Sequence, residues 1–360
     1  MKPQILALYL PQFHPFPENE EWWGKGFTEW TNVGKARPLF KGHYQPRVPA
    51  DLGYYDLRLP VVREQQVELA KEAGVTAFCY WHYWFAGKRL MESIFQDVLD
   101  SGKPDFPFCL AWANHTWRAI GCTAGNESPD VLMEQTYPGI EDAKSHMEYL
   151  LKAFHDSRYV KIGGKPFLFV YDSIQLPPLY VETFKKMTIE AGFPGLYLVA
   201  NIGDNSIKPE DIIAKGYDAV TYSSILGHSK KKETFVDKVI KNIKSIIYNQ
   251  PKNLHDYKDV IAHYYTEDDK KEYVIPQIFP NWDHSPRGGY KTIIIKNSTP
   301  NLFAVHAQEA FELIKNKNPE HQIIMLKSWN EWAEGNYMEP DLRYGKGYIE
   351  ALRKVVEKYN

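Results

Sequence analysis

The sequence has few cysteines, no long apolar run and almost no net charge. Its three cysteines lack the spacing of a disulfide framework, which argues against structural disulfides and favours a reducing compartment. No stretch approaches the length of a membrane-spanning helix, so we expect no membrane span. The 43 basic and 45 acidic residues leave a formal net charge of −2. That balance provides no general attraction to nucleic acid or to an anionic membrane.

A secretion signal is also missing from the amino terminus. The apolar run 5–10 is too short for one, and Pro11-Gln12 follows it in place of a small-residue cleavage site. We therefore expect a cytoplasmic protein, unless a leader has been trimmed from this chain. The composition carries no signal for an oligomeric state.

Eight short apolar runs recur along the 360 residues and are typical of buried strands. The runs are 5–10, 75–80, 106–112, 166–170, 196–200, 219–221, 273–279 and 323–326. Helical spacing separates most of them, over 58–73, 90–99, 140–155, 181–191, 209–215 and 301–315. This alternation predicts an α/β fold, a single (β/α)₈ TIM barrel over residues 1–360 with long βα loops. A doubly wound open sheet is the alternative, but residues 9–16 lack its glycine-rich phosphate turn.

The stretch 229–272 differs from the rest of the chain. It is polar, with charged ends and helical spacing around Val236, Ile240, Ile243 and Ile247. We interpret it as a solvated helical insertion on the surface. A lid or a partner-facing helix is the alternative.

Aromatic residues make up 14% of the chain, and many stand beside polar residues instead of within apolar runs. Flat rings next to hydrogen-bonding groups suit stacking on sugar faces. Almost every apolar run ends in such a polar and aromatic cluster. The carboxyl ends of the strands are where barrel enzymes place their active sites. The sequence therefore predicts an oligo- or polysaccharide substrate bound at this end.

Glu331 and Glu334 follow the last apolar run and are the candidate catalytic residues. In a helical turn, a spacing of three puts both carboxylates on one side, with Cβ atoms about 5–6 Å apart. Two such groups allow one to stay ionised while the other carries a proton, as breaking a glycosidic bond requires. The alternative is a solvated first helical turn, where the helix dipole favours acids.

Polar and aromatic side chains near the other strand ends are predicted to bind the substrate. They are Tyr9, Gln12, His14, Trp23, Glu29, Trp30, His82, Trp84, Asn114, Trp117, Tyr171, Trp282, Asp283, Arg287, Trp329, Asn330 and Glu339. Asp283 and Arg287 suit a clamp on a hydroxyl or an acidic substituent, or equally an ion pair with each other. The histidines lack local metal-ligand spacing, so we expect no metal and no cofactor.

Six segments together resemble one known family. They are residues 10–15 (LPQFHP), 21–32 (EWWGKGFTEWTN), 42–46 (GHYQP), 81–85 (WHYWF), 112–114 (WAN) and 328–335 (SWNEWAEG). The chain is identified through them as similar to the WbsX-like, or glycoside hydrolase family 99-like, proteins, from Tyr9 to about Asp341. Members are found in bacterial polysaccharide and O-antigen contexts and are often labelled glycosyltransferases. The related hydrolases cleave internal α-mannosidic bonds with retention, on a (β/α)₈ barrel without a metal.

The resemblance also implies roles for the two glutamates. The hydrolase motif Asn-Glu-Trp-His-Glu-Gly corresponds to Asn330–Gly335, with Ala333 in place of His. By this resemblance, Glu331 removes the proton of the sugar 2-OH, whose oxygen attacks C1 to give a 1,2-anhydro intermediate. Glu334 is then the acid and base for the leaving oxygen and for water. Such chemistry needs a 2-OH trans to the leaving group, as in α-manno or α-rhamno sugars.

We therefore expect a retaining, endo-acting glycoside hydrolase on an α-manno- or α-rhamno-configured glycan. The alternative is a glycosyltransferase of bacterial polysaccharide or O-antigen biosynthesis. Transfer from a nucleotide sugar needs a diphosphate site, and the sequence has neither a glycine-rich phosphate loop nor an Asp-x-Asp motif. A third alternative is a non-catalytic glycan-binding barrel.

Overall fold

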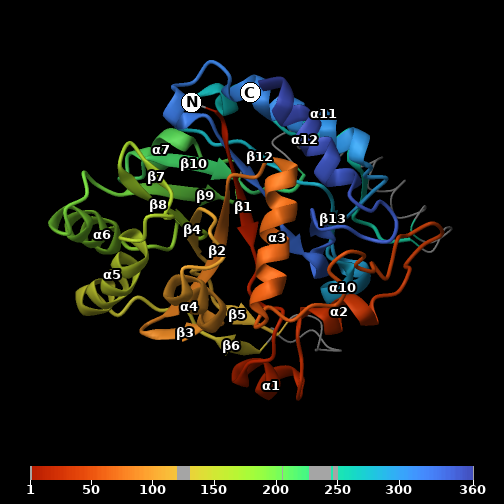
Figure 1. The fold of residues 1–360 in the computed structure, drawn as a ribbon, viewed down its shortest axis with the longest axis horizontal. Helices are drawn as coiled ribbons and strands as arrows, with labels where there is room; N and C mark the ends of the chain where they lie inside the picture. Colours follow the sequence, from red (N-terminus) through yellow and green to blue (C-terminus); the bar gives the residue numbers. More distant parts are fainter. Residues whose placement is uncertain (1, 120–129, 205, 227–244, 246–249, 360) are drawn as a thin grey trace.

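A parallel β-barrel forms the centre of the protein (Figure 1). The computed structural model describes residues 2–119, 130–204, 206–226, 245 and 250–359. The eight barrel strands are β1 (Gln4–Tyr9), β2 (Ala77–Phe85), β4 (Phe108–Trp112), β8 (Lys165–Val170), β9 (Tyr197–Ile202), β10 (Ala219–Tyr222), β12 (Gln277–Ile278) and β15 (Ile323–Leu326). All their pairings are parallel, in the order β10-β9-β8-β4-β2-β1-β15-β12. The predicted (β/α)₈ fold is confirmed.

The barrel closes between β10 and the segment that leads into β12, the two ends of this strand order. Hydrogen bonds of the Val220 backbone make the closure. The N–H of Val220 donates to the carbonyl of Tyr273 at 2.8 Å, and its carbonyl accepts from Ile275 N–H at 2.8 Å. The predicted strand 273–279 is therefore a bridge at its start and a regular strand only at Gln277–Ile278. The register Leu6↔Ala77 fixes β1 against β2.

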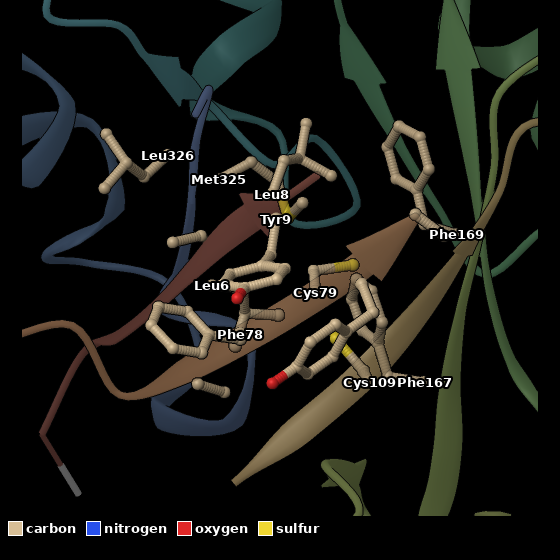
Figure 2. Packing of buried hydrophobic residues seen from close by; sticks show 14 of the residues in the cluster. Leu6, Leu8, Tyr9, Phe78, Cys79, Cys109, Phe167, Phe169, Met325 and Leu326 are labelled. Atoms are coloured by element: carbon tan, nitrogen blue, oxygen red, sulfur yellow. The ribbon is translucent and has the colours of Figure 1, made fainter. Parts of the chain in front are cut away.

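Large apolar side chains from adjacent strands are buried in one core cluster, which includes the helices packed on the barrel (Figure 2). Tyr9 and Phe78 lie with their ring centroids 4.9 Å apart. Cys79 and Cys109 lie opposite each other on β2 and β4, both buried and both free thiols. The expected lack of a disulfide is confirmed for these two, whereas Cys122 lies outside the described residues.

Helices cover the outside of the barrel (Figure 1). They are α3 (Pro60–Ala73), α4 (Glu92–Ser101), α5 (Ile140–Phe154), α6 (Pro178–Glu190), α7 (Pro209–Ile213), α11 (Pro300–Ile314) and α12 (Gly347–Tyr359). Sequence periodicity predicts the first six, and α12 is an addition. Its buried residues Ile349, Leu352 and Val355 follow the three-residue spacing of one helix face, which packs on α3 and α11. In the described ranges, no helix is long and apolar enough to cross a membrane.

Short elements fill the βα loops at the carboxyl end of the barrel. After β1 come α1 (Pro17–Trp23) and α2 (Glu29–Lys35), and after β2 comes β3 (Lys88–Leu90). The loop after β4 holds β5 (Trp117–Arg118) and β6 (Val131–Met133). After β12 come β13 (Trp282–Asp283), α10 (Ser285–Gly288), η2 (Gly289–Lys291) and β14 (Ile294–Lys296). After β15 come β16 (Asn330–Glu331), η4 (Trp332–Glu334) and β17 (Asn336–Tyr337).

Three short elements lie elsewhere. They are β7 (Lys161–Ile162), which pairs with β8, and the 3₁₀ turns η1 (Glu267–Lys270) and η3 (Pro319–His321).

The described part of the predicted insertion is not a solvated helix. Residues 227–244 and 246–249, which carry the helical spacing, lie outside the described residues. Beyond them, β11 (Leu254–Asp256) pairs with β14, and α9 (Tyr257–Ile261) buries Tyr257 and Ile261 against Phe279. The interpretation of 229–272 as one surface helix is therefore wrong for residues 254–261, because their apolar side chains pack beneath the loop that follows β12.

Gly74 offers a test of the contact between α3 and α12. It ends α3 with φ +86°, and a Cβ there would lie 3.0 Å from Val356 Cγ2 on α12. Gly102 ends α4 with φ +68° and has nothing within 4 Å of the same position. Alanine costs about 1–2 kcal/mol at each site through the left-handed backbone. We expect Gly74→Ala to lose about 1–3 kcal/mol more through overpacking, measured by urea unfolding. Equal losses in the two variants would contradict this packing.

Candidate active site

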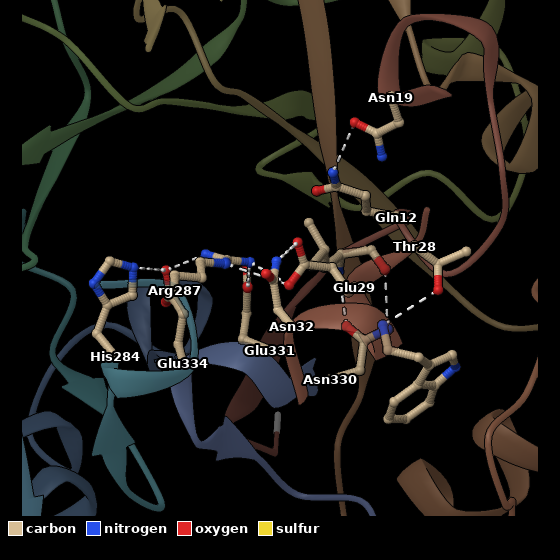
Figure 3. A network of polar contacts seen from close by, with 12 residues as sticks. Gln12, Asn19, Thr28, Glu29, Asn32, His284, Arg287, Asn330, Glu331 and Glu334 are labelled. Atoms are coloured by element: carbon tan, nitrogen blue, oxygen red, sulfur yellow. Dashed lines mark hydrogen bonds and ion pairs between the residues drawn. The ribbon is translucent and has the colours of Figure 1, made fainter. Parts of the chain in front are cut away.

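Three carboxylates meet at one guanidinium at the carboxyl end of the barrel (Figure 3). Arg287 Nη1 lies 2.6 Å from Glu334 Oε1, and its Nη2 lies 2.9 Å from Glu29 Oε2 and 3.3 Å from Glu331 Oε2. These groups come from the loops after β1, β12 and β15, which are neighbours in the barrel. The predicted meeting of Glu331 and Glu334 on one side of a turn is found.

The turn that carries the two glutamates is fixed by backbone contacts to β1. The side-chain oxygen of Asn330 accepts from Leu10 N–H at 2.7 Å, and its amide donates to the Leu10 carbonyl at 3.0 Å. Trp329 N–H donates to the Leu8 carbonyl at 2.8 Å. Gly335, with φ +60°, then ends η4 and allows β17 to pair back on β16. Glu331 and Glu334 are thus placed by a short turn whose two sides are both anchored.

A buried hydrogen-bond network supports this turn from below. The carboxylate of Glu339 accepts from Trp332 Nε1 at 2.6 Å, from Tyr55 OH at 2.9 Å and from Gln66 Nε2 at 2.7 Å. Gln66 accepts in turn from Tyr9 OH at 2.7 Å. Burial raises the pKa of Glu339 to about 7, against the opposing effect of its hydrogen-bond donors.

Four predicted substrate contacts belong to this supporting layer. Tyr9, Trp329, Asn330 and Glu339 are each at most 3% exposed. A direct glycan contact by these side chains does not fit the structure, because the chain itself surrounds them.

Burial sets the electrostatics of Glu331. Loss of solvent, then the nearby Glu334 charge, raises the pKa of Glu331 to about 8, while Arg287 opposes the shift. Lys327 lies behind the pair, and burial lowers its pKa against the pull of both glutamates. Its ammonium lies 4.7 Å from the ring centroid of Trp282. Glu331 is therefore a carboxyl group able to exchange a proton near neutral pH.

Two tyrosines and a histidine complete the surroundings of the carboxylates. Burial, then the charge of Glu331, raises the pKa of Tyr83 on β2. Burial, then the charge of Glu334, raises that of Tyr171, which follows β8 and is 37% exposed. His284 Nε2 lies 3.9 Å from Glu334 Oε1. In the described residues, no group of three or more His, Cys, Asp or Glu side chains is arranged to hold a metal ion.

Two predicted contacts on β2 point away from the site. His82 Nε2 lies 2.8 Å from His146 Nε2, and Trp84 Nε1 donates to Asp142 at 3.0 Å, both on α5. Because side chains alternate along a strand, their neighbours Trp81 and Tyr83 take the other face. The substrate contacts predicted for His82 and Trp84 are corrected accordingly.

Asp283 and Arg287 have separate partners, so the alternative of an ion pair between them is not found. Asp283 accepts from Gln45 Nε2 at 2.7 Å and lies 2.8 Å from His43 Nε2. Burial acts to raise the pKa of Asp283, but the hydrogen bond from His43 and the charge of Arg47 lower it to about 2. Asp283 therefore holds a loop, whereas Arg287 lies among the three glutamates.

Three other predicted residues also bind their own chain. Asn114 donates to the Asp172 carbonyl at 2.8 Å and accepts from its N–H at 2.7 Å. Gln12 Nε2 donates to Asn19 at 3.4 Å. His14 Nε2 lies 3.2 Å from Ser93 Oγ, and burial lowers its pKa to about 4.

The predicted tryptophans after β1 and β4 divide between packing and the rim. Trp30 donates to the Tyr55 carbonyl at 2.7 Å and packs 5.4 Å from Trp332. Trp117 lies 5.1 Å from the Tyr83 ring, beside the carboxylate cluster. Trp23 is partly buried against Phe27, 5.9 Å away.

The structure thus gathers Glu29, Tyr171, Trp282, Arg287, Glu331 and Glu334 around one point, with Trp117 at the edge. Tyr83, Lys327 and His284 belong to the site although the predicted set omits them. The sequence signal that could have identified Lys327 as a site residue is its position directly after a buried apolar run.

Replacing Glu331 with glutamine tests whether the pKa of Glu331 is raised in the folded protein. The folded chain holds the Glu331 proton more tightly than an unfolded chain, where the pKa is near 4.5. That stabilisation is complete below about pH 4.5 and disappears as the pH rises through about 8. Glu331→Gln does not titrate. The unfolding free energy of the wild type relative to the variant should therefore fall by on the order of 1 kcal/mol or more between pH 5 and pH 8.5.

Urea unfolding at several pH values measures this difference. Glu350→Gln, on the exposed side of α12, controls for loss of a carboxyl group elsewhere. A wild-type-to-variant difference that stays constant with pH would show that Glu331 titrates normally.

Solved structures share this fold. A glycoside hydrolase-like protein aligns with a TM-score of 0.59 at 14% identity, over 99% of this chain and 94% of that one. The GH99 endo-alpha-mannosidase from Bacteroides thetaiotaomicron aligns with a TM-score of 0.60 at 13% identity, over 99% and 97% of the two chains. At such identities, the likeness establishes the fold alone.

Closer relatives come from sequence. Proteins called WxcX from two strains of Xanthomonas campestris pv. campestris, B100 and ATCC 33913, are 33% identical over 358 residues. The match covers 98% of this chain, which spans about half the length of these relatives. The family described as Glycosyltransferase WbsX matches residues 5–352. The extent of that match and the identity to WxcX show that the chain belongs to the WbsX family.

Proposed function

We propose that the protein is a retaining glycoside hydrolase acting within chains of α-manno- or α-rhamno-configured glycans. One observation carries the proposal, namely that buried Glu331 and half-buried Glu334 lie on a single anchored turn and both bind Arg287. Membership of a carbohydrate-active family and the fold shared with an endo-alpha-mannosidase support it. The aromatic side chains of Tyr83, Tyr171 and Trp117 beside the carboxylates suit contact with a sugar.

The proposed first step forms one bond and breaks another on the same sugar. Ionised Glu331 takes the proton of the 2-OH, and O2 attacks C1 to close a 1,2-anhydro ring. The C1–oxygen bond to the next sugar breaks, and Glu334 gives its proton to the leaving oxygen. A carboxylate whose conjugate acid has a pKa raised towards 8 is a stronger base than an ordinary one. Arg287 stabilises the ionised forms that each step generates.

The second step reverses the proton movements. Glu334 takes a proton from water, whose oxygen attacks C1 and opens the anhydro ring. O2 recovers its proton from Glu331. Two inversions at C1 give net retention, so the product keeps the α configuration. Glu334 suits contact with water and leaving group because its side chain is 17% exposed, against 10% for Glu331.

Glycosyl transfer is the second candidate, and the family description favours it. The same anhydro intermediate gives transfer when an acceptor hydroxyl replaces water. Incubation with nucleotide sugars and an acceptor tests whether the sugar donor is a nucleotide sugar. Nucleotide release above background favours a nucleotide-sugar transferase.

The two glutamates provide the direct test of the proposal. We expect Glu331→Gln and Glu334→Gln each to lower turnover of manno- and rhamno-configured oligosaccharides by roughly 10²-fold to 10⁴-fold, because each removes a proton-transfer group. The assay is a panel of oligosaccharides with the anomeric configuration of the product followed by NMR. Thermal unfolding should show that both variants remain folded.

Glu64→Gln, exposed on α3, is the matched control and should keep full activity. Wild-type rates in either active-site variant would remove the assignment. Glycan binding that survives both changes, with no product from the wild type, would instead identify a binding barrel.

A further inference from the structure

A cavity of about 350 Å³ lies next to the carboxylate site and plays no part in the proposed reaction. It is lined by the segment 40–44 with Arg47, by β14 and the residues after it, and by Arg343 and Tyr344. Asp283 and Arg47 form the wall that it shares with η4. A Cβ on Gly335 would lie 2.9 Å from Asp283 Cβ and 3.1 Å from Arg47 Cζ. The cavity therefore adjoins the catalytic turn directly.

The lining of this cavity is strongly cationic. Lys41, Arg47, Lys296 and Arg343 contribute positive groups, and Asp283 is the single acidic residue among the lining residues that the structure describes. Asp283 is already occupied by hydrogen bonds from Gln45 and His43. The unbalanced charge selects for an anionic ligand.

Two buried polar side chains in the lining have unused hydrogen-bonding atoms. Arg47 is 7% exposed, and the contacts of its Nη atoms with the described part of the chain are long, 3.4 Å to Tyr337 OH and 3.8 Å to Asp283. Its Nε has no hydrogen-bond partner among the described residues. Asn281 is also 7% exposed, and its Oδ1 is likewise without one there. Buried polar groups are nearly always paired in folded proteins, so these atoms suit a ligand that offers both an acceptor and a hydroxyl.

Aromatic rings hold the guanidinium groups in place. Arg47 lies 5.2 Å and Arg343 4.8 Å from the ring centroid of Tyr44, and Arg343 lies 5.2 Å from that of Tyr344. Phe40 adds a further ring to the lining. Stacking on rings restricts the rotamers of both arginines, which lowers the entropy lost when a ligand binds. Phe40, Tyr44 and Tyr344 are half-buried, so part of each ring remains open to a ligand.

We propose that this cavity binds an anionic sugar unit of the glycan, one that carries a carboxylate or a phosphate. The cations and Arg47 Nε receive the acid group, Asn281 receives a hydroxyl, and the rings contact the sugar face. The volume lies within the range of small-ligand sites. The inference rests on the proposed function in one respect, that the unit belongs to the same glycan whose neighbouring bond is cleaved.

Calorimetric binding of free sugars tests the cavity without turnover, because free sugars have no glycosidic bond. The probes are mannose, glucuronic acid, mannose 6-phosphate and inorganic phosphate. We expect one of the two acidic sugars to bind at least tenfold more tightly than mannose and than inorganic phosphate. The acidic sugar that binds identifies the acid group. Its affinity should fall as the salt concentration rises.

Variants at the mouth of the cavity locate the binding. Arg343→Ala and Lys296→Ala are exposed and should each weaken acidic-sugar binding by about fivefold to tenfold. Lys186→Ala, exposed on α6 on the far side of the barrel, removes the same charge and should leave the affinity unchanged (Figure 1).

Each other outcome overturns the inference. Inorganic phosphate binding as tightly as the acidic sugars would show a general anion site, and equal effects of Lys186→Ala and Lys296→Ala would show nonspecific charge attraction. Absence of acidic-sugar binding, together with cleavage of neutral oligosaccharides that depends on Glu331 and Glu334, would remove the cavity proposal and leave the proposed function standing.

Discussion

The attraction of one guanidinium for three carboxylates is the interaction on which the site depends. Glu29, Glu331 and Glu334 are largely removed from water, and charges in that setting are tolerated only when they are paired. Arg287 supplies the pairing, and its planar fork reaches all three acids at once. Because the four residues come from loops after three neighbouring strands, the ion cluster also fastens those loops to one another.

A second set of contacts anchors the turn that carries Glu331 and Glu334. Asn330 joins β16 to the backbone of Leu10, and Glu339 binds Trp332 from beneath. Trp332 in turn stacks on Tyr337 with ring centroids 3.7 Å apart. Reacting groups held by such a second layer of contacts stay oriented before the substrate arrives.

Local patterns in the sequence predict the parts of the structure that local physics determines. Buried strands read as continuous apolar runs, and the polar clusters after them mark the rim of the barrel. The turn with Glu331 and Glu334 is predicted because both acids lie on one short segment. The face of β2 is missed, because residues 81–85 are aromatic or imidazole throughout and alternation leaves no polar signal to separate Trp81 and Tyr83 from His82 and Trp84.

Contacts between side chains far apart in the chain also could not be predicted from the sequence. Arg287 and Asp283 are four residues apart, yet one binds Glu29, more than 250 positions away, and the other binds the segment at 43–45. The local sequence does not indicate that Arg287 and Asp283 have different binding partners. The burial of α9 is missed because its partner, Phe279, belongs to another loop.

The two ends of the chain lie together at the amino end of the barrel (Figure 1). β1 begins there, with Gln4 N–H bonded to the Gln322 carbonyl, and Tyr359 reaches Glu312 in the last turn of α11. The rim with its carboxylates is at the opposite pole. An attachment at either terminus, whether an affinity handle, a solid support or a neighbouring module, would thus lie at the opposite end of the barrel and leave the carboxylate cluster unobstructed.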